Sequence, residues 1–262
     1  MKKILIVFLL FSVMTAGEGL PVLTLPDLAQ DGYFPSIPVK PTNGISFSYA
    51  SWYYDTDYSV ISVNYNDYYL GFKGLMSGNI AIRDEQPSPE PVGTTTYYNT
   101  VLYAGRSWEL DDHWTVNTAV KLLNERLFYA SSWGGAMDAE AVWTFNVRYR
   151  ALAGVENIGF MTPLNEVPTK IPARYYLGGD VSFNFFILSL KAGVNGDYDP
   201  YYRAGVRYTH PVFDISYTFD NLLQTHHLGA DIKWDEFRVG YGQFIHREGL
   251  GNPMMFTFGM QF

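Results

Sequence analysis

The chain ends with Pro253-Met254-Met255-Phe256-Thr257-Phe258-Gly259-Met260-Gln261-Phe262. From Met254 onward, the even positions all hold large apolar side chains, whereas Thr257, Gly259 and Gln261 between them are small or polar. Alternation with a period of two is the pattern of a β-strand with one apolar face. A strand this apolar that also ends in an aromatic residue is typical of a strand that crosses a membrane.

The same pattern repeats toward the N-terminus as far as Gly44. Segments of about ten residues alternate between apolar and polar side chains, and residues typical of turns separate them. We predict about fourteen strands, an even number as in single-chain bacterial outer-membrane barrels. They occupy residues 45–49, 61–65, 68–82, 94–108, 114–123, 139–147, 151–158, 175–183, 185–194, 202–209, 213–219, 226–234, 237–245 and 254–262. The predicted fold is all-β, a transmembrane antiparallel up-and-down β-barrel over residues 44–262.

The connections between these strands alternate in length. Short turns at residues 66–67, 110–113, 148–150, 184, 210–211 and 235–236 alternate with mostly longer loops at 52–57, 83–93, 128–138, 159–174, 195–200, 220–225 and 246–253. Outer-membrane barrels place tight turns in the periplasm and longer loops outside. We therefore expect the outer membrane of a Gram-negative-type bacterium, with both termini in the periplasm. A soluble β-barrel or sandwich is the alternative.

Aromatic residues support the membrane interpretation because they gather near the predicted short turns. Rings anchor at the level of the lipid headgroups, so a girdle of them is expected at each membrane surface. The band expected at the short turns consists of Tyr65, Tyr68, Trp108, Trp114, Tyr149, Trp234 and Phe262.

The N-terminus has the features of a secretory signal peptide. Lys2 and Lys3 precede an apolar run over residues 4–11, which is far shorter than the ~20 residues that a membrane-spanning helix needs. Cleavage is expected after Gly17, with Ala16 and Gly19 as alternatives. The next segment, residues 18–43, contains five prolines and suits neither a helix nor a central strand. It is predicted to be irregular, lying either in the periplasm or inside the barrel as a short plug.

Composition excludes several classes of function. The net charge is −8, and removal of the leader with its two lysines leaves 16 basic against 26 acidic residues, so nucleic acid is not an expected partner. The absence of cysteine excludes a lipid anchor on cysteine and any disulfide framework. No apolar run of ~18 residues follows the leader, so a membrane must be crossed by alternating strands.

Charged side chains share one face of the predicted strands, which must be the lumen. A Lys or Arg on the lipid face near the midplane would cost about 2 to 4 kcal/mol. The predicted inward set is Lys73, Arg106, Lys121, Glu140, Arg148, Glu156, Arg174, Asp180, Lys191, Arg203, Arg207, Asp214, Asp231, Lys233 and Arg238. We expect these charges to pair across strands. Alternatively, Arg203, Arg207 and Arg238, with Lys191 and Lys233, line a passage for an anionic group, although the neighbouring Asp214 and Asp231 would neutralise much of its positive potential. Together with His227, these residues are the lumen-lining candidates.

The sequence gives little sign of catalysis. His227 and Asp231 share a strand face, but four residues of strand separate their Cα atoms by about 13 Å, so both would need partners from other strands. Neither a nucleophile elbow nor a zinc-binding helix motif is present. We predict a protein that is not an enzyme and holds no metal or cofactor. A barrel hydrolase that uses His227 and Asp231 is the remaining catalytic hypothesis.

Several short motifs resemble a known family. Residues 45–49 with Trp52, residues 69–73 and residues 77–85 resemble the opening of the PorV/PorQ family of outer-membrane proteins, which are relatives of the FadL long-chain fatty-acid transporters. Residues 119–121, 155–159 and 172–178 are similar to later strands of that family. The resemblance implies a fourteen-stranded barrel with an N-terminal hatch. The Asn-Pro-Ala-type motif of that hatch does not occur in residues 18–43.

The resemblance also implies a function. The family passes hydrophobic small molecules or handles cargo of the type IX secretion system, so we expect transport of one of these kinds across the outer membrane. The alternative is a non-transporting structural or docking barrel whose lumen is closed by salt bridges. Expected partners are outer-membrane lipid, a barrel-assembly machinery that reads Phe262, and either a hydrophobic ligand or secretion-system proteins.

Overall fold

A computed structural model describes residues 43–51, 56–82, 90–91, 93–196, 199–221, 224–246 and 253–262. The predicted signal peptide and almost all of the predicted plug, residues 1–42, lie outside the described residues. Within the described part of the chain, no helix is long and apolar enough to cross a membrane.

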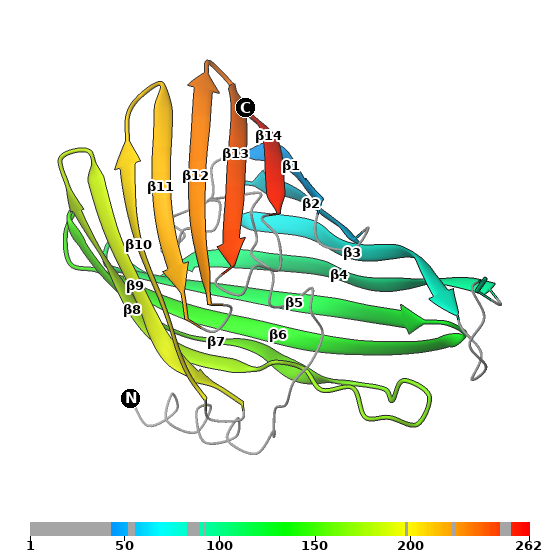
Figure 1. The fold of residues 1–262 in the computed structure, drawn as a ribbon. Helices are drawn as coiled ribbons and strands as arrows, with labels where there is room; N and C mark the ends of the chain where they lie inside the picture. The colour runs from blue at the N-terminus through cyan, green and yellow to red at the C-terminus, as the bar shows by residue number, and fades with distance from the viewer. Residues whose placement is uncertain are drawn as a thin grey trace, which may run out of the picture.

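Antiparallel strands form one closed barrel (Figure 1). Each strand pairs with its neighbours in the sequence, and the terminal strand pairs with the first, with Phe47 opposite Phe258. The strands are β1 (Gly44–Ser51), β2 (Thr56–Tyr65), β3 (Tyr68–Ile82), β4 (Gly93–Glu109), β5 (Trp114–Leu127), β6 (Ala130–Thr144), β7 (Tyr149–Met161), β8 (Arg174–Phe183), β9 (Phe186–Asn195), β10 (Pro200–Thr209), β11 (Phe213–Asp220), β12 (Thr225–Trp234), β13 (Phe237–His246) and β14 (Met254–Gln261). The predicted fold class is confirmed.

The barrel has two unlike ends. At the end that we call the short-turn end, the connections are residues 66–67, 110–113, 145–148, 184–185, 210–212 and 235–236. Asn66, Asn184 and Asp235 have positive φ angles of 55°, 51° and 51° there, a conformation that Asn and Asp tolerate better than most residues. The opposite end, which we call the long-loop end, includes the described loop 162–173. The predicted alternation of turns thus holds at the short-turn end.

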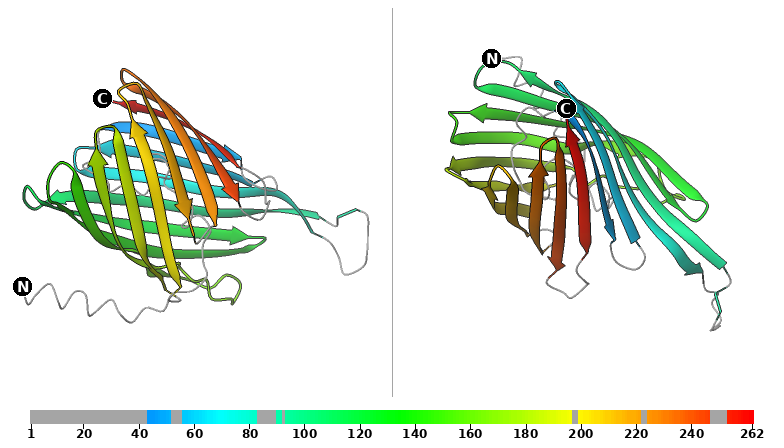
Figure 2. Two further views of the ribbon diagram at one scale, coloured as in Figure 1. Left: turned by 60° about the vertical axis from the view of Figure 1, so that its left-hand side comes forward. Right: turned by 90° about the horizontal axis from the view of Figure 1, so that it is seen from above.

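One predicted loop is wrong. Residues 128–138 were expected to connect two strands, but β5 and β6 continue as a ladder until only Phe128 and Tyr129 remain between them. The glycines and serines of this stretch are typical of loops, yet here they pack in a strand. A Cβ atom on Gly134 would lie 2.2 Å from the Phe160 carbonyl oxygen, so the close approach of β7 requires a glycine. The strands from β3 to β7 consequently extend well beyond the others (Figures 1 and 2).

Side chains alternate between an outer apolar face and a buried inner face. On β14, the outward side chains of Phe256 and Phe258 are 58% and 50% exposed. The inward side chain of Met255, the residue before Phe256, is only 3% exposed. Every ring of the band predicted for the short turns is exposed, and two neighbouring rings, Trp114 and Trp143, stack with centroids 5.6 Å apart. An outer apolar belt with rings near one end is the surface that a bilayer requires.

Candidate functional site inside the barrel

The inner face has an apolar side, which we call the apolar wall. Its buried side chains come from β1 to β6, from β13 and β14, and from the loop before β8. They are Ala50, Tyr58, Val60, Leu75, Val101, Tyr103, Leu123, Ala136, Ile171, Phe244 and Met255. None of them exceeds 7% exposure, and Tyr69, Tyr97 and Met161 pack against them. Water-filled barrels have polar interiors, so this wall is suited to contact with apolar groups.

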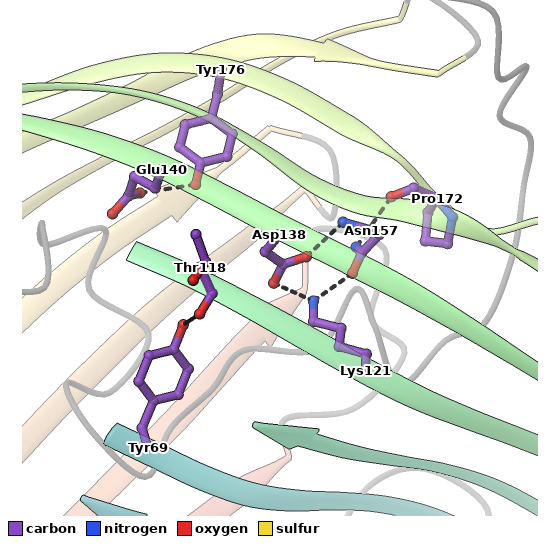
Figure 3. A network of polar contacts seen from close by, with 8 residues as sticks. All are labelled: Tyr69, Thr118, Lys121, Asp138, Glu140, Asn157, Pro172 and Tyr176. Atoms are coloured by element: carbon purple, nitrogen blue, oxygen red, sulfur yellow. Dashed lines mark hydrogen bonds and ion pairs between the residues drawn. The ribbon is translucent and has the colours of Figure 1, made fainter. Parts of the chain in front are cut away.

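Inward tyrosines of this wall pack over the glycines that face them on the neighbouring strand. A Cβ atom on Gly71 would lie 2.2 Å from Cζ of Tyr103, and one on Gly105 would lie 2.1 Å from Cζ of Tyr69. The hydroxyl of Tyr69 then donates to the Thr118 carbonyl oxygen at 2.8 Å (Figure 3). Each ring therefore fills the space that a side chain on the glycine would occupy.

The rest of the inner face, which we call the polar wall, contains most of the charges; β5, β6 and β13 contribute to both walls. One network joins β5, β6, β7 and the end of loop 162–173 (Figure 3). Lys121 Nζ lies 2.6 Å from the Asp138 carboxylate and donates to Asn157 Oδ1 at 2.6 Å. The Asn157 backbone N–H donates to Asp138, and its Nδ2 donates to the Pro172 carbonyl oxygen. The polar wall is thereby connected to a loop at the long-loop end.

A second network centres on Glu140, which is 9% exposed. Its carboxylate accepts from the Tyr176 hydroxyl at 2.9 Å (Figure 3). It also accepts from Asn117 Nδ2 at 3.3 Å. Lys191 Nζ lies 3.6 Å from the same carboxylate and 4.9 Å from the centroid of the Tyr176 ring. Because the carboxylate has partners on three sides, its charge is compensated within the wall.

Further ion pairs lie across neighbouring or nearby strands of the polar wall. Within the described residues they join Arg150 to Asp180 at 2.7 Å, Arg203 to Asp220 at 2.7 Å, Lys233 to Asp214 at 2.7 Å, and Arg238 to Asp231 at 2.8 Å. The predicted pairing of inner charges across strands is therefore present. Neighbouring opposite charges cancel much of the potential that would attract a free anion.

Glu156 is an acid of this wall that interacts with several cations at once. The charges of Lys191, Arg174, Lys121 and Arg203 all act on its carboxylate. Arg174 is 6% exposed, and its guanidinium lies 5.6 Å from the centroid of the Tyr201 ring. The middle of the polar wall is thus a mixed cluster of both signs.

All eight candidate residues lie on the inner face. Lys191, Arg203, Asp214, Asp231, Lys233 and Arg238 belong to the ion pairs described above, and Arg207 is 7% exposed. His227 is buried, and its ring centroid lies 4.7 Å from that of Phe244 on the apolar wall. Over the described residues, no three His, Asp or Glu side chains are close enough to hold a metal ion.

Two residues of the predicted inward set lie elsewhere. Arg106 was expected in the lumen, but Ser107 occupies the inner position, so Arg106 points outward between the rings of Tyr68 and Trp108. Arg148 is in the short turn before β7, and Arg150 occupies the inner position instead. In both cases the predicted inward position is off by one or two residues. A shift of one residue moves a side chain to the other face of the strand, and a shift at a strand end can move a residue into the turn.

Sequence reasoning overlooked Asn157, which organises the first network. Its φ angle is 59°, and the register between β6 and β7 shifts between Met137 and Ala139. An extra residue in one strand is a β-bulge, which redirects a side chain. The signal available in the sequence was the interrupted alternation at Glu156-Asn157, where two polar residues follow one another.

Neither a protein-family model nor a curated protein matches the chain. Solved structures do match. The toluene transporter TodX of P. putida has a TM-score of 0.56 at 10% identity, with 86% of this chain and 91% of that chain covered. The chain shares the fold of a transport channel. A second TodX structure has a TM-score of 0.53 at 9% identity and covers 94% of both chains.

A FadL homologue of Pseudomonas aeruginosa is similar in the same way. Its TM-score is 0.51 at 10% identity, and 94% of this chain and 98% of that chain are covered. At such identities the likeness concerns the fold. This likeness agrees with the predicted relation to FadL-type transporters. Membership of the PorV/PorQ family stays a prediction.

Proposed function

We propose that the chain is an outer-membrane channel through which hydrophobic small molecules pass. The observation that supports this most is the apolar wall inside a closed membrane-type barrel. The likeness in fold to a toluene transporter and to a FadL homologue supports the same function. In this proposal the short turns lie in the periplasm, the long loops lie outside, and residues 18–43 plug the barrel.

The two walls favour an apolar cargo over an ionic one. A small aromatic molecule that moves about 150 Å² of its own apolar surface from water into an apolar interior would gain roughly 4 kcal/mol from the hydrophobic effect. An ion would meet carboxylates and cations that already neutralise one another, such as Lys233 with Asp214. The interior therefore offers binding energy to the first kind of molecule and little to the second.

Uptake of a hydrophobic fluorescent probe by whole cells tests the proposal. Cells that produce the barrel, in a host without its own channels for hydrophobic compounds, should accumulate 1-N-phenylnaphthylamine faster than cells with an empty vector. The double variant Val60→Thr, Val101→Thr makes the apolar wall more polar at nearly constant volume, and it should slow this uptake severalfold.

The matched control is Val116→Thr, Val194→Thr, which makes the same change on the outer face and should leave uptake intact. Heat-modifiable migration on gels confirms that each variant is folded. If the folded barrel takes up no probe, and none after deletion of residues 18–43, then the proposal is wrong.

A closed docking barrel is the second candidate, and the paired charges of the polar wall favour it. Such a barrel would remain shut to ions in planar bilayers and to hydrophobic probes in cells. Handling of secretion-system cargo is the other kind of transport that the resemblance implies, and it would be supported by secretion proteins that co-purify with the barrel.

A further inference from the structure

The outer face of the described strands contains very few ionised side chains. Those that point outward from the described strands are Asp57, Arg106 and Arg126. Asp57 and Arg126 lie next to the long-loop end, and Asp57 accepts a hydrogen bond from the Tyr49 hydroxyl at 2.5 Å. Arg106 is different, because it lies three residues from the end of β4 at the short-turn end.

Two outward rings hold the Arg106 guanidinium between them. Its Cζ atom lies 4.0 Å from the Trp108 ring centroid and 4.9 Å from the Tyr68 ring centroid. Tyr68 is directly opposite Arg106 in the pairing of β3 with β4. Trp108 is fixed in turn, since its Nε1 donates to the Thr118 hydroxyl at 3.2 Å. Arg106 is therefore placed by packing rather than loosely exposed.

Within the described part of the chain, this cation has no anionic partner. Among the described residues, no carboxylate forms an ion pair with Arg106, and its buried Nε atom has no hydrogen-bond acceptor. A charge at the lipid surface is costly unless it is paired or reaches the headgroup level. The surrounding band of rings, including Trp114 and Trp143, marks that level on this side of the barrel.

The N–H donors of the Arg106 guanidinium indicate which kind of anion would bind there. A guanidinium presents several N–H groups in one plane, which match the oxygens of a phosphate in a bidentate arrangement. The aromatic band places these donors where the phosphates of a leaflet lie. We propose that Arg106, Tyr68 and Trp108 form a binding site for the phosphate of a glycerophospholipid in the leaflet at the short-turn end.

Native mass spectrometry of the purified barrel in detergent tests this site, with phosphatidylglycerol as the probe. Arg106→Gln should weaken phosphatidylglycerol binding by about tenfold or more, the loss expected when a charge-assisted hydrogen bond to phosphate is removed. Arg126→Gln is the matched control, because it removes the same side chain from the same face at the opposite end, and it should bind the lipid as the unaltered barrel does.

Two further measurements separate the phosphate from the acyl chains and from folding. Diacylglycerol, which lacks the phosphate, should bind the unaltered barrel and Arg106→Gln equally. Arg106→Lys keeps the charge but not the planar fork, so its affinity should fall between the two. Unchanged phosphatidylglycerol binding in Arg106→Gln overturns the proposal. The proposal is also overturned if Arg106→Gln binds lipid normally but no longer associates with a second copy of the barrel. In that case the partner of Arg106 would be a carboxylate of the second copy.

Discussion

Lys121 Nζ donates to the side-chain oxygen of Asn157 at 2.6 Å, and Asn157 has a φ angle of 59°. One asparagine thus supplies both the left-handed turn of a β-bulge and the contact that joins a lysine of β5 to the carbonyl of Pro172. Because the loop before β8 contributes Ile171 to the apolar wall, Asn157 connects the two walls of the interior.

Replacement of Asn157 should separate its backbone role from its side-chain role. Asn157→Gly keeps the left-handed conformation and loses only hydrogen bonds, at about 1 kcal/mol for each bond. Asn157→Ala loses the same bonds and adds about 1 to 2 kcal/mol of backbone strain. Urea unfolding in detergent micelles, followed by tryptophan fluorescence, should rank stability as unaltered barrel, then glycine, then alanine. Equal stabilities of the two variants would contradict the strain argument.

Removing one partner of the Lys121 and Asp138 ion pair should destabilise the barrel more than removing both charges. Lys121→Met leaves a partly buried carboxylate without its closest cation and should cost about 2 kcal/mol, less than for a fully buried pair because both side chains retain some exposure. Lys121→Met, Asp138→Asn removes both charges and keeps an acceptor for the Asn157 N–H. We expect the double variant to be more stable than either single variant. A double-mutant cycle with no coupling would show that the pair does not act as a unit.

Much of the barrel could be predicted from alternation and turn residues, because a face that meets lipid tolerates few charges and so leaves a clear period of two. The method failed where pairing geometry outweighed local composition. Gly134 and Ser131 were interpreted as loop residues, yet the contact of β7 with Gly134 explains a glycine in the middle of a strand. No local pattern contains that information, because the carbonyl of Phe160 lies far along the sequence.

The sequence predicted most of the charged residues that point into the barrel, but it did not predict which of them contact one another. Partners such as Lys191 and Glu140 come from strands that are not neighbours in the sheet, and Tyr176 lies between them. Reach across an inner surface depends on barrel curvature, which a strand pattern does not encode. The apolar wall was missed for a related reason: Leu123 and Phe244 lie on different strands, and each alone is unremarkable.

Two short turns provide a matched pair for a pH experiment. The Asp111 carboxylate accepts from the backbone N–H groups of His113 and Trp114, both at 2.8 Å, and these bonds hold the pKa of Asp111 below its ordinary value of 3.8. Asn146 accepts from the N–H groups of Arg148 and Tyr149 in the same way but has no charge to lose.

A lowered folded-state pKa adds stability above the ordinary pKa, and that stability is lost as the pH falls through the lowered value. Unfolding of the barrel should therefore become easier below about pH 4 partly because of Asp111. Asp111→Asn should flatten this part of the stability profile, and Asn146→Asp should steepen it. The measurement is the urea midpoint between pH 6 and about 2.5, since both turns face water. Identical profiles for all three proteins would contradict the assignment.

The end of the chain closes the barrel and also presents its last ring. The N–H of Phe262 donates to the Asn43 carbonyl oxygen at 3.1 Å, which continues the pairing of β14 with β1, while the Phe262 side chain is 63% exposed. Deletion of Phe262 removes both the bond and the ring and should lower the amount of folded barrel in the outer-membrane fraction severalfold. A single backbone bond contributes only about 1 kcal/mol, too little to prevent assembly.

The ring is therefore the feature that assembly should depend on, and two substitutions that keep the backbone bond test this. Phe262→Ser should lower the outer-membrane level nearly as much as the deletion, whereas Phe262→Trp, which keeps an aromatic terminus, should restore it. Levels are measured as the heat-modifiable band in isolated membranes. If Phe262→Ser inserts normally while the deletion does not, then closure through Asn43 matters rather than recognition of the ring. Normal levels of the truncated protein would count against both roles.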